Sequence, residues 1–287
     1  MITVVIPSYN RAHLLPQIIP SYLQKNVTKI LLIDDASSDD TTHVVKELQK
    51  KIPELEYVRL EKNSKQVFAK NVGIDLTETE WIYFGDDDSI LVPNSLEKLL
   101  NTCIINNADV CGGKALYQDK QEDLLSYVKR NDIFIDPDKI VNIKNLTARF
   151  QYSVTQPIEV SFTHASALVR TEVAKRIRFD INYFGNCYRE ETDFFIRCKM
   201  DGSKLFYNSD AVQVNLPRGV ATGGAHSSGK IKWYYYSIVN NHYFMKKNWA
   251  NIRRNFQNVQ PSFVVEAKFI LNLFLGVIDN ITKKIIK

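Results

Sequence analysis

The 287-residue sequence is short of the features that mark several special classes of protein. Its four cysteines form no Cys-x-x-Cys pair and have no histidine at zinc-site spacing, so we expect reduced structural thiols rather than a disulfide framework. No apolar run reaches the roughly 18 residues that a membrane-spanning helix needs. The N-terminus has neither a basic segment nor a small-residue cleavage site, so we expect no signal peptide and a cytoplasmic protein.

An excess of charge of one sign is also missing. The 37 Lys and Arg residues face 32 Asp and Glu residues, which gives a formal net charge of +5. Hydrophobic residues make up 45% and charged residues 24%, as is typical of a soluble globular protein, and this excludes a largely disordered chain. The length predicts one large α/β domain or two small ones. Net charge alone does not discriminate between nucleic acid, membrane and anionic ligands.

Short apolar runs alternate with helical patterns in the first part of the chain. The apolar runs lie at residues 2–6, 29–33, 55–60 and 81–84. The helical patterns lie at residues 12–25, from the end of the polar stretch 34–40 to residue 50, at 65–76 and at 93–106. This alternation predicts a mostly parallel, doubly wound sheet flanked by helices. Ligands bind such sheets at the carboxyl ends of strands, and polar clusters follow three of these runs, at residues 8–11, 34–40 and 86–88.

The second part of the chain is less regular. We expect strands at residues 108–115, 160–169, 204–207 and 211–216, helices at 171–178 and 190–200, and a glycine-rich loop at 217–229. Neither an internal repeat nor a low-complexity segment is present in the sequence.

Three consecutive aspartates, from Asp86 to Asp88, follow the fourth apolar run. Like charges at this spacing repel one another, and a divalent cation that prefers oxygen ligands, Mg²⁺ or Mn²⁺, would relieve the repulsion. The alternative is a solvated acidic turn that caps the next helix. Two interpretations also apply to Asp34 and Asp35. They could belong to a stretch that only starts the next helix, or their carboxylates could bind a nucleobase or ribose. In the second case Tyr9 could stack on the base.

Four motifs in a fixed order carry a resemblance to a known family. They read Val-Val-Ile-Pro-Ser-Tyr-Asn-Arg at residues 4–11, Leu-Ile-Asp-Asp-Ala-Ser-Ser-Asp-Asp-Thr at 32–41, Ala-Lys-Asn-Val-Gly at 69–73 and Phe-Gly-Asp-Asp-Asp at 84–88. Together they resemble the inverting family 2 glycosyltransferases of GT-A fold, a Rossmann-like α/β fold. The resemblance is strong over about residues 1–110 and looser to about residue 216.

The resemblance implies a nucleotide-sugar donor site in the first half, with Mn²⁺ or Mg²⁺ as cofactor. Tyr9 and Asp35 would bind the base, and Asp86 and Asp88 would form the DxD motif that holds the metal. The full set of donor-contacting residues that it implies is Pro7, Tyr9, Arg11, Asp35, Lys70, Asn71, Asp86 and Asp87. Lys70 stands where the family usually has arginine, which keeps the charge but loses the planar fork.

The pair Glu190 and Glu191 at a predicted helix start resembles the family's Glu-Asp pair, in which the Asp is the general base. Glu191 occupies the Asp position, so its carboxylate would remove the proton of the acceptor hydroxyl. Glu190 and Asp193 are its local rivals. The alternative for all three acids is to complement the dipole at the start of the helix.

A third metal ligand is less clear from the sequence. Family members often carry a histidine after the late strand, where this chain has Asn215, so His226 would have to reach back from the glycine-rich loop. His164 is expected on the strand that floors the acceptor site. A lone histidine is more often a structural, hydrogen-bonded residue, which is the alternative for both histidines.

Residues 211–265 contain no acid and seven cations, so this stretch carries +7 and the rest of the chain sums to −2. Aromatic residues are interleaved with these cations. The stretch fits a donor pyrophosphate, a pyrophosphate-linked lipid acceptor or an anionic membrane surface better than a nucleic acid. The alternative is a solvated basic helix whose aromatics pack on the domain.

The last segment, from about residue 262 to 287, is amphipathic at 100° per residue. One face carries Phe263, Ala267, Ile270, Phe274, Val277, Ile278, Ile281 and Ile285. A helix of this kind binds a membrane interface, or it docks on its own domain or on a second subunit, which would make the protein a homo-oligomer.

The sequence therefore predicts a catalytic domain over residues 1–216, with a donor half at about 1–110 and an acceptor half at about 111–216. A basic aromatic segment at 217–260 and an amphipathic helix at 261–287 follow. The predicted function is inverting, metal-dependent transfer from a nucleotide sugar, UDP favoured, to a glycan or lipid-linked saccharide in surface polysaccharide biosynthesis. The expected location is the cytoplasm or the inner face of the plasma membrane. The alternative is a catalytically inactive sugar-nucleotide or glycan-binding protein of the same fold.

Overall fold

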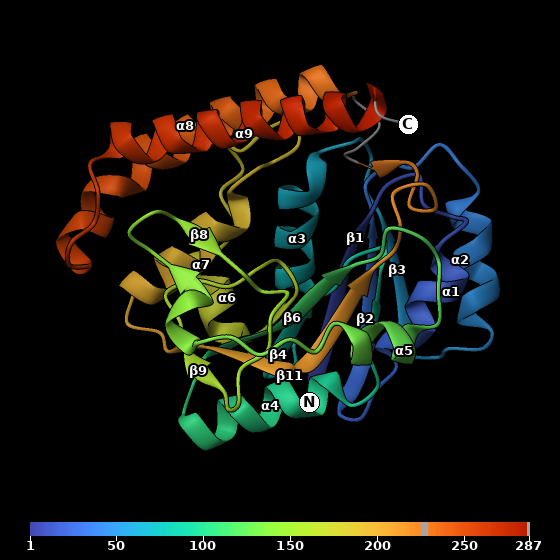
Figure 1. Cartoon of the computed structure of the whole chain (residues 1–287). Coiled ribbons are helices and arrows are strands. Elements are labelled where there is room, and N and C mark those ends of the chain that lie inside the picture. The colour runs from blue at the N-terminus through green and yellow to red at the C-terminus, as the bar shows by residue number, and fades with distance from the viewer. Residues whose placement is uncertain (225–228, 286–287) are drawn as a thin grey trace.

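A mixed β-sheet forms the centre of the molecule in the computed structural model (Figure 1). The structure describes residues 1–224 and 229–285, with side chains up to residue 275. Across these residues the strands neighbour one another in the order β3 (Leu55–Arg59), β2 (Val27–Asp34), β1 (Ile2–Ser8), β4 (Trp81–Phe84), β10 (Ala167–Arg170), β6 (Val110–Tyr117), β11 (Leu205–Asn215) and β5 (Ser89–Leu91), and β9 (Ile158–Glu159) pairs with β11.

The first half of the sheet is parallel and the second half is mixed. β1 pairs in parallel with β2 and β4, and β2 pairs in parallel with β3. β10 then runs antiparallel between β4 and β6, whereas β11 is again parallel to β6. This α/β architecture confirms the predicted fold class. The parallel strands read as continuous apolar runs because helices cover both of their faces.

Two layers of helices bury the sheet. One face packs against α1 (Leu15–Ile18), the 3₁₀ turn η1 (Ile19–Tyr22), α2 (Thr41–Gln49) and α4 (Ser95–Asn106). The other face packs against α3 (Lys65–Leu76), α6 (Thr171–Ile177) and α7 (Glu190–Met200). The segment between β6 and β9 contains α5 (Leu124–Arg130), η2 (Pro137–Lys139) and the small ladder of β7 (Val141–Asn142) with β8 (Thr147–Ala148).

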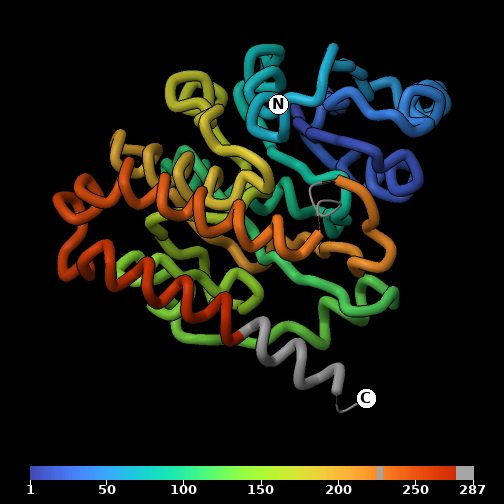
Figure 2. The backbone as a smooth tube through the Cα atoms, turned by 90° about the horizontal axis from the view of Figure 1, so that it is seen from above, coloured from blue at the N-terminus to red at the C-terminus, as the bar shows by residue number. Residues whose placement is uncertain are grey.

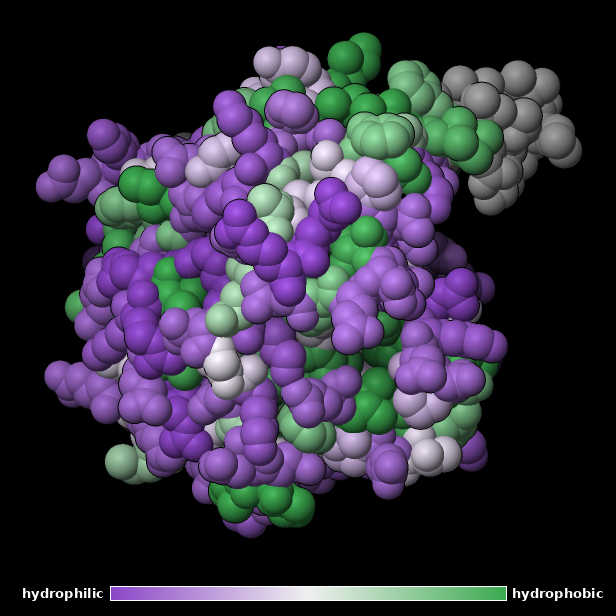
Figure 3. Space-filling model, turned by 90° about the vertical axis from the view of Figure 1, so that its left-hand side faces the viewer, coloured by the Kyte–Doolittle hydropathy of each residue, from purple (hydrophilic) through white to green (hydrophobic). Residues whose placement is uncertain are grey.

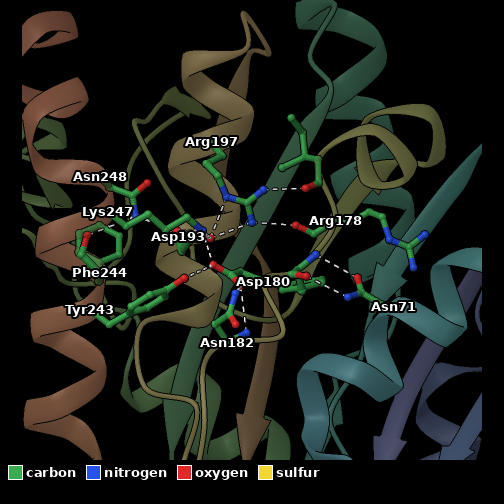
Figure 4. A network of polar contacts seen from close by, with 12 residues as sticks. Asn71, Arg178, Asp180, Asn182, Asp193, Arg197, Tyr243, Phe244, Lys247 and Asn248 are labelled. Atoms are coloured by element: carbon green, nitrogen blue, oxygen red, sulfur yellow. Dashed lines mark hydrogen bonds and ion pairs between the residues drawn. The ribbon is translucent and has the colours of Figure 1, made fainter.

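The last two helices, α8 (Lys230–Asn255) and α9 (Ser262–Ile285), lie side by side across one end of the molecule (Figures 1 and 2). Phe244 and Trp249 of α8 are buried in the same hydrophobic cluster as α3 and α7. Polar contacts reinforce this packing, because Lys247 of α8 binds both Asp180 and the fully buried Asp193 of α7 (Figure 4). The α8 helix is therefore part of the core.

Three local predictions were wrong, each for a physical reason. The helix expected at residues 12–25 is limited to α1 and η1, because Pro16 and Pro20 each begin a new short turn. The two strands expected at 204–207 and 211–216 form one strand, β11, whose pairing shifts between Asn208 and Val212. The strand expected at 160–169 is confined to β10.

The segment before β10 is irregular because side chains replace backbone pairing there. His164 lies outside any strand, with Nε2 2.6 Å from the backbone oxygen of Gly113. A Cβ atom on Gly112 would lie 1.8 Å from Oγ1 of Thr163, so the Thr163 side chain fills the space above β6. Burial lowers the pKa of His164, which keeps the imidazole neutral.

Candidate active site

A cavity of about 360 Å³ lies at the carboxyl ends of β1, β2 and β4. The three polar clusters that follow these strands meet there, as the parallel topology predicts. The lining residues are Pro7, Ser8, Tyr9, Arg11, Asp35, Asn63, Lys65, Gln66, Asp86, Asp87, Asp88, Gly185, Cys187, Gly224 and Tyr236. Six of the eight predicted donor residues are among them, and Lys70 and Asn71 are not.

The end of β1 is tied to the aspartate cluster after β4. The hydroxyl of Ser8 donates to Asp87 over 2.8 Å, and Arg11 Nη1 lies 3.2 Å from Asp88 Oδ2. Burial raises the pKa of Asp87 to about 7, against the opposing attraction of Arg11. Three carboxylates with one arginine thus leave this wall of the cavity negative, which suits a bound cation.

Asp35 is the member of the second acidic cluster that faces the cavity. Its carboxylate accepts hydrogen bonds from the backbone N–H groups of Ser64 (2.6 Å) and Lys65 (2.9 Å) at the start of α3. Asp34 instead turns into the protein, where it accepts hydrogen bonds from Tyr57 and Arg59. The structure thus separates the two residues: Asp34 braces β3 and Asp35 remains at the ligand side.

Asp86 is held in place from two sides. The hydroxyl of Tyr22 lies 2.9 Å from both the backbone N–H and the backbone oxygen of Asp86, and Ser166 donates to its carboxylate over 2.9 Å. Gly85 is required at this turn, because a Cβ atom there would lie 2.9 Å from the Tyr22 ring. The carboxylate of Asp86 is therefore held in a fixed position on the cavity wall.

The carboxylate oxygens of this cavity suit a hard divalent cation, but they do not form a complete metal site. Among the described residues, no group of three His, Cys, Asp or Glu side chains is placed to hold a metal ion. Mg²⁺ commonly binds proteins through one or two carboxylates and takes its remaining ligands from phosphate and water. Asp86 and Asp88 supply two carboxylates of this kind. His226, the third ligand expected from the sequence, lies outside the described residues.

The acid pair at the start of α7 is bound to Lys70 of α3. Lys70 Nζ lies 2.7 Å from Glu190 Oε1 and 3.2 Å from Glu191 Oε1, and Gln66 donates to Glu190 over 2.9 Å. Glu190 is 1% exposed and its second oxygen has no hydrogen-bond partner among the described residues, whereas the side chain of Glu191 is 32% exposed. Burial raises the pKa of Glu190, whereas the attraction of Lys70 lowers it.

Glu191 and Asp86 both attract the positive charge of Lys70. Burial alone would lower the pKa of Lys70, but its attraction to Glu190, Glu191 and Asp86 outweighs burial and raises it. Glu191, a half-buried acid, is therefore held by a cation, Lys70, that is also attracted to Asp86.

Two predicted site residues have structural contacts in this conformation. Asn71 donates its amide to the backbone oxygen of Phe179 and accepts from the Phe179 N–H, each over 2.9 Å, and is buried (Figure 4). It therefore fixes the segment between α6 and α7. Lys70, in turn, contacts the acids of α7. Asp193, the rival base, is fully buried and binds Arg197 and Lys247.

Sequence reasoning missed the part of the cavity that the later chain supplies. Gly185 has φ +64°, and a Cβ atom on it would lie 2.3 Å from Cγ of Tyr236 in α8. Only glycine therefore lets this aromatic ring close the cavity. Burial raises the pKa of the neighbouring Cys187 thiol to about 12, which keeps it protonated. Gly185 carries no local signal, and Tyr236 stands in a run of aromatics at residues 233–236 that the sequence analysis could assign only to the basic stretch as a whole.

The family follows from comparison with known proteins. The model of Glycosyl transferase family 2 matches residues 3–178, more than half of the chain, so the chain belongs to this family. A stretch of 115 residues is 36% identical to the GalNAc(5)-diNAcBac-PP-undecaprenol beta-1,3-glucosyltransferase of Campylobacter jejuni, covering 39% of this chain and 37% of that protein. A stretch of 120 residues is 29% identical to the poly(ribitol-phosphate) beta-N-acetylglucosaminyltransferase TarP of Staphylococcus aureus, covering 39% of this chain and 36% of that protein. These matches span little more than a third of either relative.

Solved structures share the fold over most of the chain. Staphylococcus aureus TarS 1-349, solved in complex with UDP-GlcNAc, has a TM-score of 0.60 and 17% identity, covering 86% of this chain and 67% of that one. The mannosyltransferase PcManGT from Pyrobaculum calidifontis, solved with GDP-Man and Mn²⁺, has a TM-score of 0.60 and 15% identity, covering 94% and 68%. At these low sequence identities the structural similarity shows that the fold is shared.

Proposed function

We propose that this protein transfers a sugar from a nucleotide-sugar donor to a saccharide acceptor, with inversion at the anomeric carbon. The observations that carry the proposal are the meeting of Asp35, Asp86 and Asp88 in one cavity and the binding of Glu191, at the start of α7, to Lys70. A carboxylate is needed for each of three tasks: binding the nucleotide, holding the metal that binds the phosphates, and accepting the proton of the attacking hydroxyl. The family membership supports the same reaction class.

The donor nucleotide would lie along the ends of β1 and β2. Asp35 accepts hydrogen bonds from the base or ribose, and the ring of Tyr9 offers a stacking surface. Lys65 and Arg11 line the same cavity and supply positive charge for the two phosphates. UDP is the favoured nucleotide, and a solved protein of this fold binds UDP-GlcNAc.

Asp86 and Asp88 would hold the divalent cation, Mn²⁺ or Mg²⁺, together with the donor phosphates. A cation bound there neutralises the negative charge that develops on the departing nucleoside diphosphate. A relative in fold was solved with Mn²⁺. Ser166 and Tyr22 keep Asp86 oriented through direct hydrogen bonds.

Glu191 would serve as the general base. Its carboxylate takes the proton of the acceptor hydroxyl as that oxygen bonds to the anomeric carbon and the bond from that carbon to the diphosphate oxygen breaks. Lys70, held by the buried Glu190, keeps Glu191 oriented. Because the Cys187 thiol stays protonated, it does not compete as a nucleophile, which agrees with a single displacement.

The proposed acceptor is a glycan or lipid-linked saccharide of a surface polysaccharide pathway. The relative from Campylobacter jejuni is named for an undecaprenol-linked acceptor and TarP for poly(ribitol-phosphate). Access to a lipid-linked acceptor would place this protein at the inner face of the plasma membrane. Within the part of the chain that the structure describes, no helix is long and apolar enough to cross a membrane.

The test is a turnover assay with UDP- and GDP-sugars and Mn²⁺, preceded by a thermal-shift screen of nucleoside diphosphates. We expect a UDP-induced stabilisation, Mn²⁺-dependent release of UDP, and a product of inverted anomeric configuration by NMR. Nucleotide binding without release under any donor would instead support the inactive binding protein. Retention of configuration would contradict the single displacement.

A further inference from the structure

The outward side of α9 is an apolar surface. Its large side chains, Phe263, Leu271, Phe274 and Leu275, are 70%, 57%, 58% and 52% exposed. Figure 3 shows hydrophobic side chains gathered along the top of the molecule. Large contiguous apolar patches are rare on monomeric soluble proteins and usually mark a contact surface. We call these four residues the α9 face.

The opposite side of α9 is the one that packs on the protein. Val265 is buried in the main hydrophobic cluster, and the ring of Phe269 stacks on Tyr188 with centroids 5.3 Å apart. Glu266, the one acid of α9 up to residue 275, lies 3.0 Å from His242 of α8. Of the three uses that the sequence left open, docking on its own domain thus engages the inward side of α9 and leaves the α9 face uncovered.

Exposed cations lie on the neighbouring helix α8. The exposed cations of the neighbouring α8 are Lys230, Lys232, Lys246, Arg253 and Arg254, and none of them forms an ion pair within the described residues. The other lysine of α8, Lys247, is paired with Asp180 and Asp193. The pair of helices therefore combines an apolar stripe with an uncompensated positive surface.

We propose that the α9 face, together with these α8 cations, docks onto an anionic lipid bilayer. An amphipathic helix of this kind lies in the interface plane, buries its apolar side chains at the acyl boundary and gains from anionic headgroups. A second copy of the chain fits less well, because a two-fold contact would bring the same patch, with its cations, against itself. The bilayer supplies both the apolar phase and the opposite charge.

Docking of this kind would also orient the cavity. α8 packs against α9 and carries Tyr236, which lines the cavity, so the helix pair links the bilayer surface to the site. Presentation of a lipid-linked acceptor to Glu191 then follows, a consequence that rests on the proposed function. The docking itself depends only on the α9 face and the α8 cations.

The test is cosedimentation of the full chain with sucrose-loaded vesicles, without donor or acceptor. Vesicles of equimolar phosphatidylcholine and phosphatidylglycerol should bind the protein, and phosphatidylcholine alone should bind it less. The double substitution Leu271→Glu and Phe274→Glu should reduce partitioning about tenfold or more, because two large apolar side chains no longer enter the bilayer and two negative charges face its anionic headgroups. Raised salt should weaken the binding.

The matched control is Ile104→Glu with Ile105→Glu on α4, two isoleucines that are 65% and 81% exposed on another face. This variant should bind vesicles like the wild type, and so should Glu191→Gln, which separates docking from turnover. The proposal would be overturned if the wild-type protein did not bind anionic vesicles, or if the variant with both α9 substitutions bound them as well as the wild type. A dimer in light scattering that these changes dissociate, without vesicle binding, would assign the face to a second copy instead.

Discussion

Lys70 Nζ lies 2.7 Å from Glu190 Oε1, and the two side chains are 2% and 1% exposed. This buried ion pair joins α3 to the start of α7 and so sets the position of the neighbouring Glu191. Removing one partner of a buried pair leaves an uncompensated charge, which costs more than the pair itself contributes.

Replacing Lys70→Met should therefore lower the free energy of unfolding by about 3–5 kcal/mol in urea titrations. The matched control is Lys50→Met, which removes an exposed lysine paired with Glu47 on α2 and should leave the stability unchanged. The double variant Lys70→Met with Glu190→Gln should recover part of the loss. If Lys70→Met and Lys50→Met lowered the free energy of unfolding equally, the buried pair would not stabilise the fold.

The second prediction concerns pH. Burial alone would raise the pKa of Asp180, but hydrogen bonds from Lys247, the Asn182 backbone and Tyr243 lower it to about 2, below its ordinary 3.8. A lowered folded pKa contributes stability above the unfolded pKa and loses it as pH falls through the folded pKa. The stability difference between wild type and Asp180→Asn should therefore shrink from pH 4 toward pH 2, within about two pH units.

Thermal unfolding of both proteins across this range measures the effect. Because Lys247 and Tyr243 belong to α8, the substitution should loosen the contact between α8 and the segment that joins α6 to α7 (Figure 4). A difference that stays constant with pH would mean that the Asp180 carboxylate is not responsible for it.

The third prediction concerns the closure of the cavity by α8. Gly185→Ala places a Cβ atom against Tyr236 and forces alanine to φ +64°, so we expect the dissociation constant for UDP to rise about tenfold. Gly202→Ala is the control, since Gly202 also has a positive φ, +94°, but nothing lies within 4 Å of its Cβ position. Calorimetric titration compares the two, and equal UDP affinity would place Tyr236 outside the donor site.

The fourth prediction concerns the acidic wall of the cavity. Asp88→Asn removes one carboxylate that would hold the cation, and several kilocalories per mole of charge stabilisation correspond to a fall in turnover of about a hundredfold or more. The exposed Asp119→Asn should have no effect. Manganese titration of each variant, followed by UDP release, makes the measurement. Undiminished turnover in Asp88→Asn would remove that residue from the reaction.

The sequence was informative where a residue's role follows from its position along the chain. Strand ends at Asp35 and Asp86 meet at one edge because the strands are parallel, so their grouping was predictable. The start of α7 at Glu190 was predicted correctly because apolar periodicity and acidic first-turn residues coincide there.

The remainder of the site depends on tertiary contacts that leave no local pattern. Tyr236 reaches the cavity only because α8 folds back over Gly185. Asn71 was predicted to contact the donor, yet its amide binds the backbone of Phe179, and nothing near it in sequence indicated this partner. The outward orientation of the α9 face also required knowing which side of the helix Val265 anchors.

The most direct test of the proposed reaction is the turnover of Glu191→Gln with Mn²⁺ and the preferred nucleotide sugar. Glutamine keeps the size of the side chain but cannot take the acceptor proton, so the turnover rate should fall by about 10²–10⁴-fold. The stabilisation by UDP in a thermal shift should stay at the wild-type value, because Glu191 does not line the cavity. Wild-type turnover in this variant would contradict the assignment of Glu191 as the base.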